Sequence, residues 1–205
     1  MRANVWVTAA AAAALAALLA LPAGALGQPD ITADTTMGEI RANESLIAAG
    51  FDTHDRNILL PEQPWMYDDW TLRQYLGGTA PDAAAGLNLV IDNYNHGVQV
   101  TYKLYTPEEI AADPRKDEVE LYYFPAKGGS AAPVKYALVV PGNMYEKSAK
   151  MREGCSVSYQ MHEMGYAAFV LRYSVGHDNT DNAAYTKRLM NAFLPKTKSL
   201  RNMNP

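Results

Sequence analysis

The residues of this chain that could act as nucleophiles lie in its last third, and none has the required neighbours. An exposed serine on a sharp strand-to-helix turn needs the pattern Gly-x-Ser-x-Gly, which occurs nowhere in the sequence. Ser156, in Gly154-Cys155-Ser156-Val157-Ser158, lacks the second glycine, so we interpret it as a residue at the start of a helix. Ser174 follows a predicted strand, but Arg172 stands where the first glycine should be.

The other reactive side chains also form no catalytic or metal-binding pattern: Cys155, His54, His96, His162 and His177. Cys155 has no matching order of His and Asp around it, and a buried helix cysteine is the simpler interpretation. His162 lacks the second histidine of a zinc-binding helix. His177 lies beside Asp178 and Asp181, which is a weak cation pattern. We therefore predict no catalytic triad, no metal and no cofactor in this chain.

Two neighbouring strands are predicted in the middle of the sequence. Residues 98–105 alternate apolar and polar side chains, which is the periodicity of a strand. Thr106, Pro107 and Glu109 then form the start signal of a short helix, with a capping box. The β-branched and aromatic run at residues 119–124 predicts a second strand. Because only this short helix separates the two strands, we expect them to pair.

The segment that follows predicts a parallel βαβ unit. Residues 136–140 are apolar throughout, as in a strand buried on both faces. A helix is expected from about Glu153 to Met164, with Gly165 as its left-handed C-cap. Residues 166–173 form another apolar strand. Two strands joined by a helix in this way usually lie parallel.

Several short motifs follow one another in a fixed order through this unit: Pro141-Gly142, Tyr145, Glu153-Gly154, Gly165-Tyr166 and Arg172-Tyr173-Ser174-Val175-Gly176. In this order they resemble the α/β-hydrolase superfamily, specifically bacterial esterases of the acetyl-xylan-esterase and dienelactone-hydrolase kind. The upstream Thr106–Glu109 and Tyr122–Ala126 are similar to the lead-in of the same group. The resemblance implies an α/β fold with a partial α/β-hydrolase sheet. Antiparallel lead-in strands would precede the parallel βαβ unit, and the sheet would be incomplete at the C-terminus.

The same resemblance implies an oxyanion hole in the loop after the apolar strand. Its donors would be the backbone N–H groups of Asn143 and Met144, each worth about 3 kcal/mol in acyl transfer. Gly142 and Tyr145 would belong to the loop and the crevice. Relatives often have glycine where Asn143 and Met144 stand, and methionine adopts a left-handed conformation poorly. The alternative is a plain strand-to-helix loop.

Residues 1–27 are predicted to be a signal peptide. One basic residue precedes an Ala/Leu-rich run that ends at Leu21, where Pro22 and Gly24 interrupt it. Ala25-Leu26-Gly27 offers small residues for cleavage. The alternative is an uncleaved anchor, because the apolar run is nearly long enough to span a membrane. We expect a secreted, periplasmic or cell-envelope protein with no membrane contact after cleavage.

The 205 residues carry a net charge of -4, which argues against a nucleic-acid partner, and a single cysteine, which excludes an intrachain disulfide. Residues 28–97 are expected to be an N-terminal extension of uncertain structure, with helical turns at Glu44–Ala49 and a helix at Trp65–Leu76. Residues 98–176 form the hydrolase N-terminal half. Residues 177–205 form a polar, basic tail with one short predicted helix, Ala183–Leu194.

The resemblance thus implies an exported carboxylic-ester hydrolase with a serine nucleophile, acting on a carbohydrate or small-molecule ester without a cofactor. In relatives the serine elbow and the catalytic acid and histidine come later in the chain. We therefore expect these 205 residues to be a truncated form that is inactive alone, or a reduced protein with another task. A second hypothesis is a non-catalytic carbohydrate-binding or interaction module. It rests on four clustered aromatic residues: Trp65, Tyr67, Trp70 and Tyr75.

Overall fold

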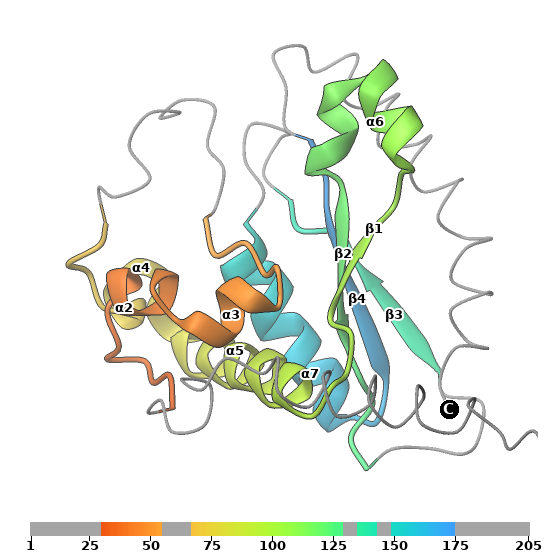
Figure 1. Cartoon of the computed structure of the whole chain (residues 1–205). Coiled ribbons are helices and arrows are strands. Elements are labelled where there is room, and N and C mark those ends of the chain that lie inside the picture. Colours follow the sequence, from red (N-terminus) through yellow and green to blue (C-terminus); the bar gives the residue numbers. More distant parts are fainter. Residues whose placement is uncertain (1–29, 55–66, 129–134, 143–148, 175–205) are drawn as a thin grey trace, which may run out of the picture.

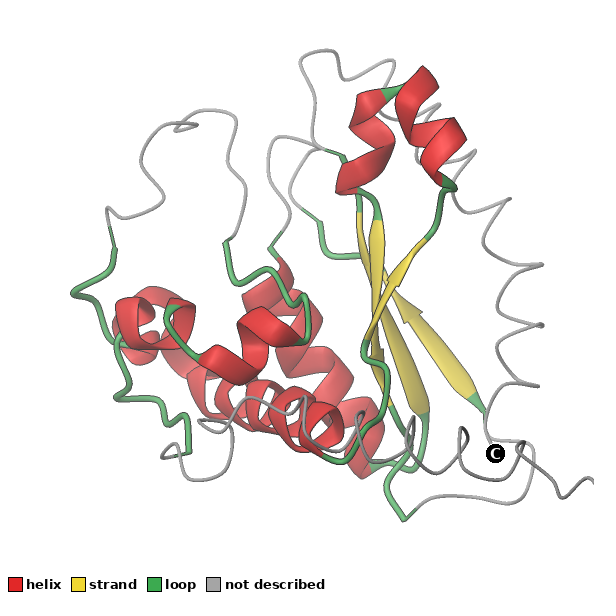
Figure 2. Cartoon of the chain, in the orientation of Figure 1, coloured by secondary structure: helices red, strands yellow, loops and turns green. Residues whose placement is uncertain are grey.

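A computed structural model describes residues 30–54, 67–128, 135–142 and 149–174. In these parts a four-stranded mixed sheet carries most of the helices on one of its sides (Figures 1 and 2). The chain is therefore a mixed α/β protein, as the sequence predicts.

The sheet has the order β1-β2-β4-β3. Its strands are β1 Thr101–Lys103, β2 Glu120–Phe124, β3 Tyr136–Val139 and β4 Ala167–Arg172. β1 and β2 pair antiparallel, as do β2 and β4, whereas β3 and β4 pair parallel. The predicted pairing of the two lead-in strands and the predicted parallel βαβ unit are both confirmed.

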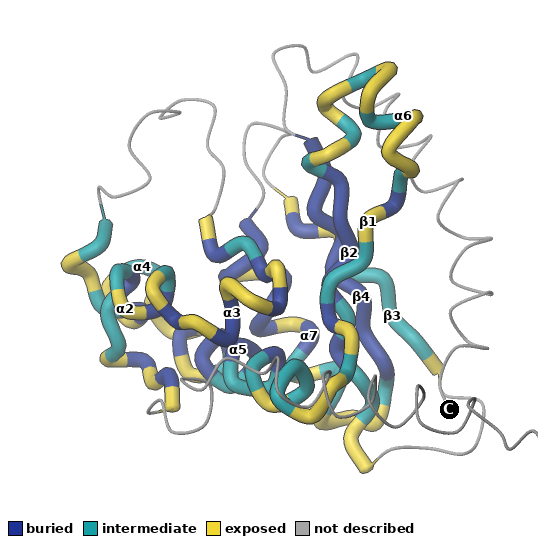
Figure 3. The backbone as a smooth tube through the Cα atoms, viewed as in Figure 1, coloured by how far each residue is buried: buried dark blue, intermediate teal, exposed yellow. Residues whose placement is uncertain are grey.

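One expectation about the sheet is wrong. Residues 136–140 were expected to be buried on both faces, but every residue of β3 is only half-buried and Val140 is exposed. The reason is its position, because among the described strands β3 pairs only with β4 and lies at the sheet edge. Figure 3 shows the contrast with β2 and β4, which are buried along nearly their whole length.

Nine helical segments accompany the sheet in the described part of the chain. They are α2 Met37–Arg41, α3 Glu44–Ala48, α4 Leu72–Leu76, η1 Gly77–Thr79, α5 Ala80–Asn95, α6 Pro107–Ala112, η2 Pro114–Glu118, η3 Lys150–Cys155 and α7 Ser156–Glu163. η1 and η2 are 3₁₀ turns, and η3 is a π-helical turn. The predicted helix at 153–164 is thus a π-helical turn that continues into α7.

Short polar signals start several of these helices. Thr106 caps α6 and forms the predicted capping box with Glu109, and Gly165 adopts the predicted left-handed conformation after α7, at φ 80°. The helix expected at 65–76 is shorter than predicted, because Thr71 accepts the N-cap bond from Gln74 and α4 begins only at Leu72. A threonine hydroxyl at an N-cap satisfies a backbone N–H of the first helical turn, which it cannot do from inside a helix.

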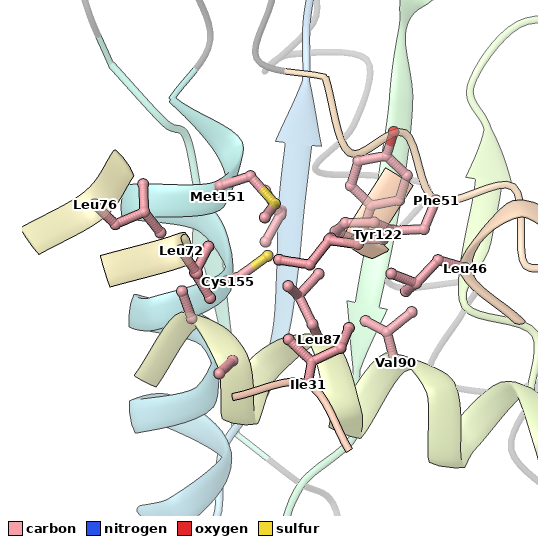
Figure 4. Packing of buried hydrophobic residues seen from close by; sticks show 14 of the residues in the cluster. Ile31, Leu46, Phe51, Leu72, Leu76, Leu87, Val90, Tyr122, Met151 and Cys155 are labelled. Carbon is pink, nitrogen blue, oxygen red and sulfur yellow. The ribbon is translucent and has the colours of Figure 1, made fainter. Parts of the chain in front are cut away.

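The longest helix in the described part of the chain, α5, lies in the N-terminal region for which the sequence carries no clear structural signal. It packs against the sheet face that carries Tyr122 and Val170, and its buried residues include Leu87 and Val90 (Figure 4). Gly86 allows the closest approach, because a Cβ there would lie 2.7 Å from the carbonyl oxygen of Cys155. The described residues of this region, 30–54 and 67–95, are therefore part of the same core as the sheet.

Several expectations lie outside the described residues: the leader 1–27, the tail 177–205 and its helix Ala183–Leu194. Among the helices that the structure describes, none combines the length and the apolar character needed to cross a membrane.

Candidate functional site

The candidate site lies at the carboxyl ends of the parallel strands β3 and β4. In open α/β sheets, ligands bind in the crevice outside this edge. Pro141 and Gly142 follow β3, and Tyr173 and Ser174 follow β4. The loop of residues 50–54 and the start of η3 join them there through the contacts described below.

A single peptide unit after β3 is held at both of its polar atoms. The carbonyl oxygen of Pro141 accepts a hydrogen bond from the buried hydroxyl of Tyr173, at 2.6 Å. The N–H of Gly142, in the same peptide plane, donates to Oε2 of Glu153, also at 2.6 Å. Because both ends of the plane are fixed, the direction in which the chain leaves β3 is fixed as well.

η3 presents charged side chains to three different segments. Lys150 forms an ion pair with Asp52, at 2.8 Å. Arg152 donates to the carbonyl oxygen of Tyr75 at the end of α4, at 3.0 Å. Glu153 reaches Gly142, as described. π-Helical turns are rare, and those that exist are often found at functional sites. In η3 the charged side chains of three neighbouring residues each contact a different segment.

Gly154 explains how η3 comes so close to the sheet. A Cβ at this position would lie 2.8 Å from Cγ1 of Val170 on β4 and 3.6 Å from the ring of Pro141. A side chain at this position would force the turn or Val170 to shift, so glycine lets η3 lie close to β4 while Glu153 reaches Gly142. The motifs Pro141-Gly142, Glu153-Gly154 and Arg172-Tyr173 are distant in the sequence, yet the structure brings them into one contact group.

A buried ion network lies beside this group, centred on the carboxylate of Asp52. Oδ1 accepts from the backbone N–H of His54 at 2.9 Å and lies 3.1 Å from its Nδ1. Oδ2 lies 2.8 Å from Nζ of Lys150 and 3.0 Å from the guanidinium of Arg172. The Lys150 side chain is only 1% exposed, so its charge depends on this pairing.

Arg172 extends the network across the sheet. It is the cross-strand partner of Glu120 on β2, and its Nη1 lies 2.7 Å from Oε2 of that carboxylate. Lys103, opposite Glu120 on β1, pairs with Oε1 at 2.8 Å. The hydroxyl of Tyr122 donates to Glu120 at 2.9 Å. A row of alternating charges thus crosses three strands at one end of the sheet.

The network affects the ionisation of Asp52 and Tyr122. Burial alone would raise the pKa of Asp52, but the hydrogen bond from His54 and the charges of Lys150 and Arg172 outweigh burial and hold that pKa well below its usual range. Burial, together with the charge of Glu120, raises the pKa of Tyr122 well above its ordinary value. Asp52 therefore stays ionised at neutral pH and Tyr122 stays a neutral hydrogen-bond donor.

Of the four predicted site residues, only Gly142 lies in the described part of the chain. Asn143, Met144 and Tyr145 lie outside it. The N–H of Gly142 is bound to Glu153, so the Gly142 amide shapes the loop rather than serving a ligand. Sequence reasoning named Glu153 and Arg172 only as parts of motifs and missed Asp52 and Lys150. The sequence carries no signal for those two, because no local pattern predicts that distant charges meet.

The remaining chemical candidates have structural roles where they are described. Cys155 is buried, as expected, and Ser156 lies at the start of α7 with its hydroxyl 3.3 Å from the carbonyl oxygen of Thr79. His162 bonds the carbonyl oxygen of Pro125, and His96 that of Asp92. Within the described ranges, no three His, Cys, Asp or Glu side chains are placed to share a metal ion.

Comparison with known proteins gave no relatives. No family model, no curated protein and no solved structure matches this chain significantly.

Proposed function

We propose that this chain is the N-terminal half of an exported carboxylic-ester hydrolase of the α/β-hydrolase type. The proposed substrate is an ester of a carbohydrate or small molecule. In this proposal the described residues between 30 and 174 supply one wall of the substrate crevice and the base of the oxyanion loop, and the serine nucleophile lies on another stretch of polypeptide. The 205 residues contain no Gly-x-Ser-x-Gly.

One observation carries the proposal: the motifs that resemble the esterases meet around the peptide between Pro141 and Gly142. Glu153 and Tyr173 hold the two polar atoms of that peptide, and Gly154 provides the close approach. The bonded positions are 11 and 32 residues apart in the sequence, and the parallel βαβ unit brings them together at the carboxyl ends of its strands. The antiparallel lead-in strands followed by a parallel pair also fit the architecture that the resemblance implies.

The chemistry follows from the position of this peptide. Amides that leave the carboxyl end of a parallel strand point into the crevice, where acyl transfer develops negative charge on the carbonyl oxygen. In the proposal the donors are the N–H groups of Asn143 and Met144. The preceding N–H, that of Gly142, donates to Glu153. The ion pair of Lys150 with Asp52 fixes the start of η3. A serine activated by histidine would attack the ester carbonyl.

Two measurements test the proposal. The 205-residue chain should show no serine-dependent hydrolysis of p-nitrophenyl acetate, and turnover that a serine-directed inhibitor abolishes would contradict this. The DNA after the Pro205 codon should encode Gly-x-Ser-x-Gly in some reading frame within a few hundred bases. Finding no such pattern there would remove the proposed nucleophile.

A further inference from the structure

A compact group of aromatic side chains lies on the segment before and within α4. Tyr67 and Trp70 have ring centroids 4.9 Å apart in an edge-to-face arrangement, and Tyr67 and Tyr75 have centroids 5.5 Å apart. Trp70 is 44% exposed, whereas the two tyrosines are half-buried. The ester-hydrolase proposal uses none of these three residues, which we call the aromatic group.

The backbone beneath the aromatic group is fixed by hydrogen bonds to α2. Met37 donates to the carbonyl oxygen of Trp70 at 2.8 Å, and Gly38 donates to that of Asp68 at 3.0 Å. Arg41 also forms an ion pair with the Asp68 side chain. The exposed ring of Trp70 is therefore presented on a rigid support, which lowers the entropy that binding a ligand would cost.

The surroundings of Trp70 are polar rather than apolar. Asp69, Arg73 and Gln74 are exposed on the same short segment. The other exposed large apolar side chains of the described chain belong to other segments: Ile47, Val140, Val157 and Met164. A docking site for a protein usually presents a larger continuous apolar patch, so this surface fits a small ligand with both an apolar face and many hydroxyl groups.

We propose that the aromatic group is a binding site for neutral oligosaccharides. The C–H face of a pyranose ring would pack on the indole of Trp70, and its hydroxyl groups would donate to carboxylate oxygen, with Asp69 the nearest exposed acceptor in sequence. The side chain of Asp68, 42% exposed, and the exposed Asp69 both disfavour anionic sugars. This site does not depend on the proposed ester hydrolysis, because binding needs no serine nucleophile.

The test is isothermal titration of the full 205-residue chain with cellohexaose, xylohexaose and mannohexaose, three neutral hexasaccharides. We expect at least one of them to bind, and Trp70→Ala to weaken that binding at least tenfold. Trp70→Phe keeps an aromatic face and should retain part of the affinity, which separates loss of the ring from loss of fold. Met164→Ala removes an even more exposed apolar side chain elsewhere, 58% exposed, and should bind like the native chain.

Three outcomes would overturn the proposal. They are binding of none of the hexasaccharides, equal binding by Trp70→Ala and the native chain, and a dimer in solution that Trp70→Ala dissociates. The last result would assign the surface to a second copy of the chain. This test measures binding and not hydrolysis. A negative result would therefore leave the ester-hydrolase proposal unaffected, and a failure of the ester-hydrolase proposal would leave the binding site unaffected.

Discussion

Glu153 Oε2 lies 2.6 Å from the backbone nitrogen of Gly142, 11 residues earlier in the chain. The bond joins the π-helical turn that starts the crossover helix to the exit of the strand before it. Tyr173, on the far side of the crossover, holds the other polar atom of the same peptide. Side chains from the start of the crossover helix and from the end of β4 therefore both bind the peptide after β3, where the oxyanion loop is proposed to begin.

Removing the Glu153 carboxylate should release the Gly142 amide. A hydrogen bond to a charged acceptor contributes about 1.5–3 kcal/mol, and exposure puts this bond at the low end. We expect Glu153→Ala to speed hydrogen exchange of the Gly142 amide about tenfold, measured by NMR. Glu153→Gln keeps an acceptor oxygen, so its exchange rate should lie between those of the native chain and Glu153→Ala. Glu163→Ala removes an exposed glutamate of α7 and serves as the control, and unchanged exchange in Glu153→Ala would contradict the proposed role.

The Asp52 network should make stability depend on acid pH. Removing one partner from a buried ion group leaves uncompensated charge, so Asp52→Asn should lower the free energy of unfolding by about 3 kcal/mol at pH 7. The pKa of Asp52 is depressed in the folded chain. Its contribution is therefore complete above the unfolded pKa of about 3.9 and is lost as the pH falls below it.

Urea unfolding from pH 7 to pH 3 measures this contribution. The native chain should lose stability more steeply on acidification than Asp52→Asn, so the two curves should begin to approach each other below about pH 4 and still differ at pH 3. The control is Asp34→Asn, because the pair of Asp34 with Arg73 is exposed on both sides and should contribute less than about 1 kcal/mol. Parallel curves for the native chain and Asp52→Asn would show that Asp52 is not held ionised by its neighbours.

The contact between α5 and η3 should not tolerate a side chain at Gly86. A Cβ there would lie 2.7 Å from the carbonyl oxygen of Cys155, which is backbone and cannot rotate away. We expect Gly86→Ala to lower the free energy of unfolding by about 1–3 kcal/mol, although alanine favours a helix by about 1 kcal/mol over glycine. Gly78→Ala, with open space around it, should be neutral. Equal stability of the two variants in thermal unfolding would contradict the packing.

Local patterns predicted the four strands, α6 and α7 because each carries its own signal. Thr106 with Glu109 sets the start of α6, and Gly165 sets the end of α7. The burial of β3 could not be read in the same way. An apolar run shows that a strand favours a buried environment, but its actual burial depends on which elements lie beside it. β3 lies at the edge of the described sheet.

The site was predicted less completely than the fold. The sequence identifies Pro141-Gly142 and Glu153-Gly154 as motifs, but it does not predict the hydrogen bond between Gly142 and Glu153. Asp52 and Lys150 gave no sequence signal, because 98 positions separate two charges that meet only after α5 and the sheet have packed. Ion pairs between distant segments are a consequence of the fold and cannot be read from local spacing.

The most direct test of the hydrolase account is labelling with a fluorophosphonate probe, which reacts with activated serines. The polypeptide to be labelled is this chain extended through the reading frame that carries a downstream Gly-x-Ser-x-Gly. The account predicts that the extended polypeptide is labelled on the serine of that motif and hydrolyses p-nitrophenyl acetate, while the 205-residue chain is not labelled. An unlabelled, folded extended polypeptide, or a label on a serine within the 205 residues, would contradict it.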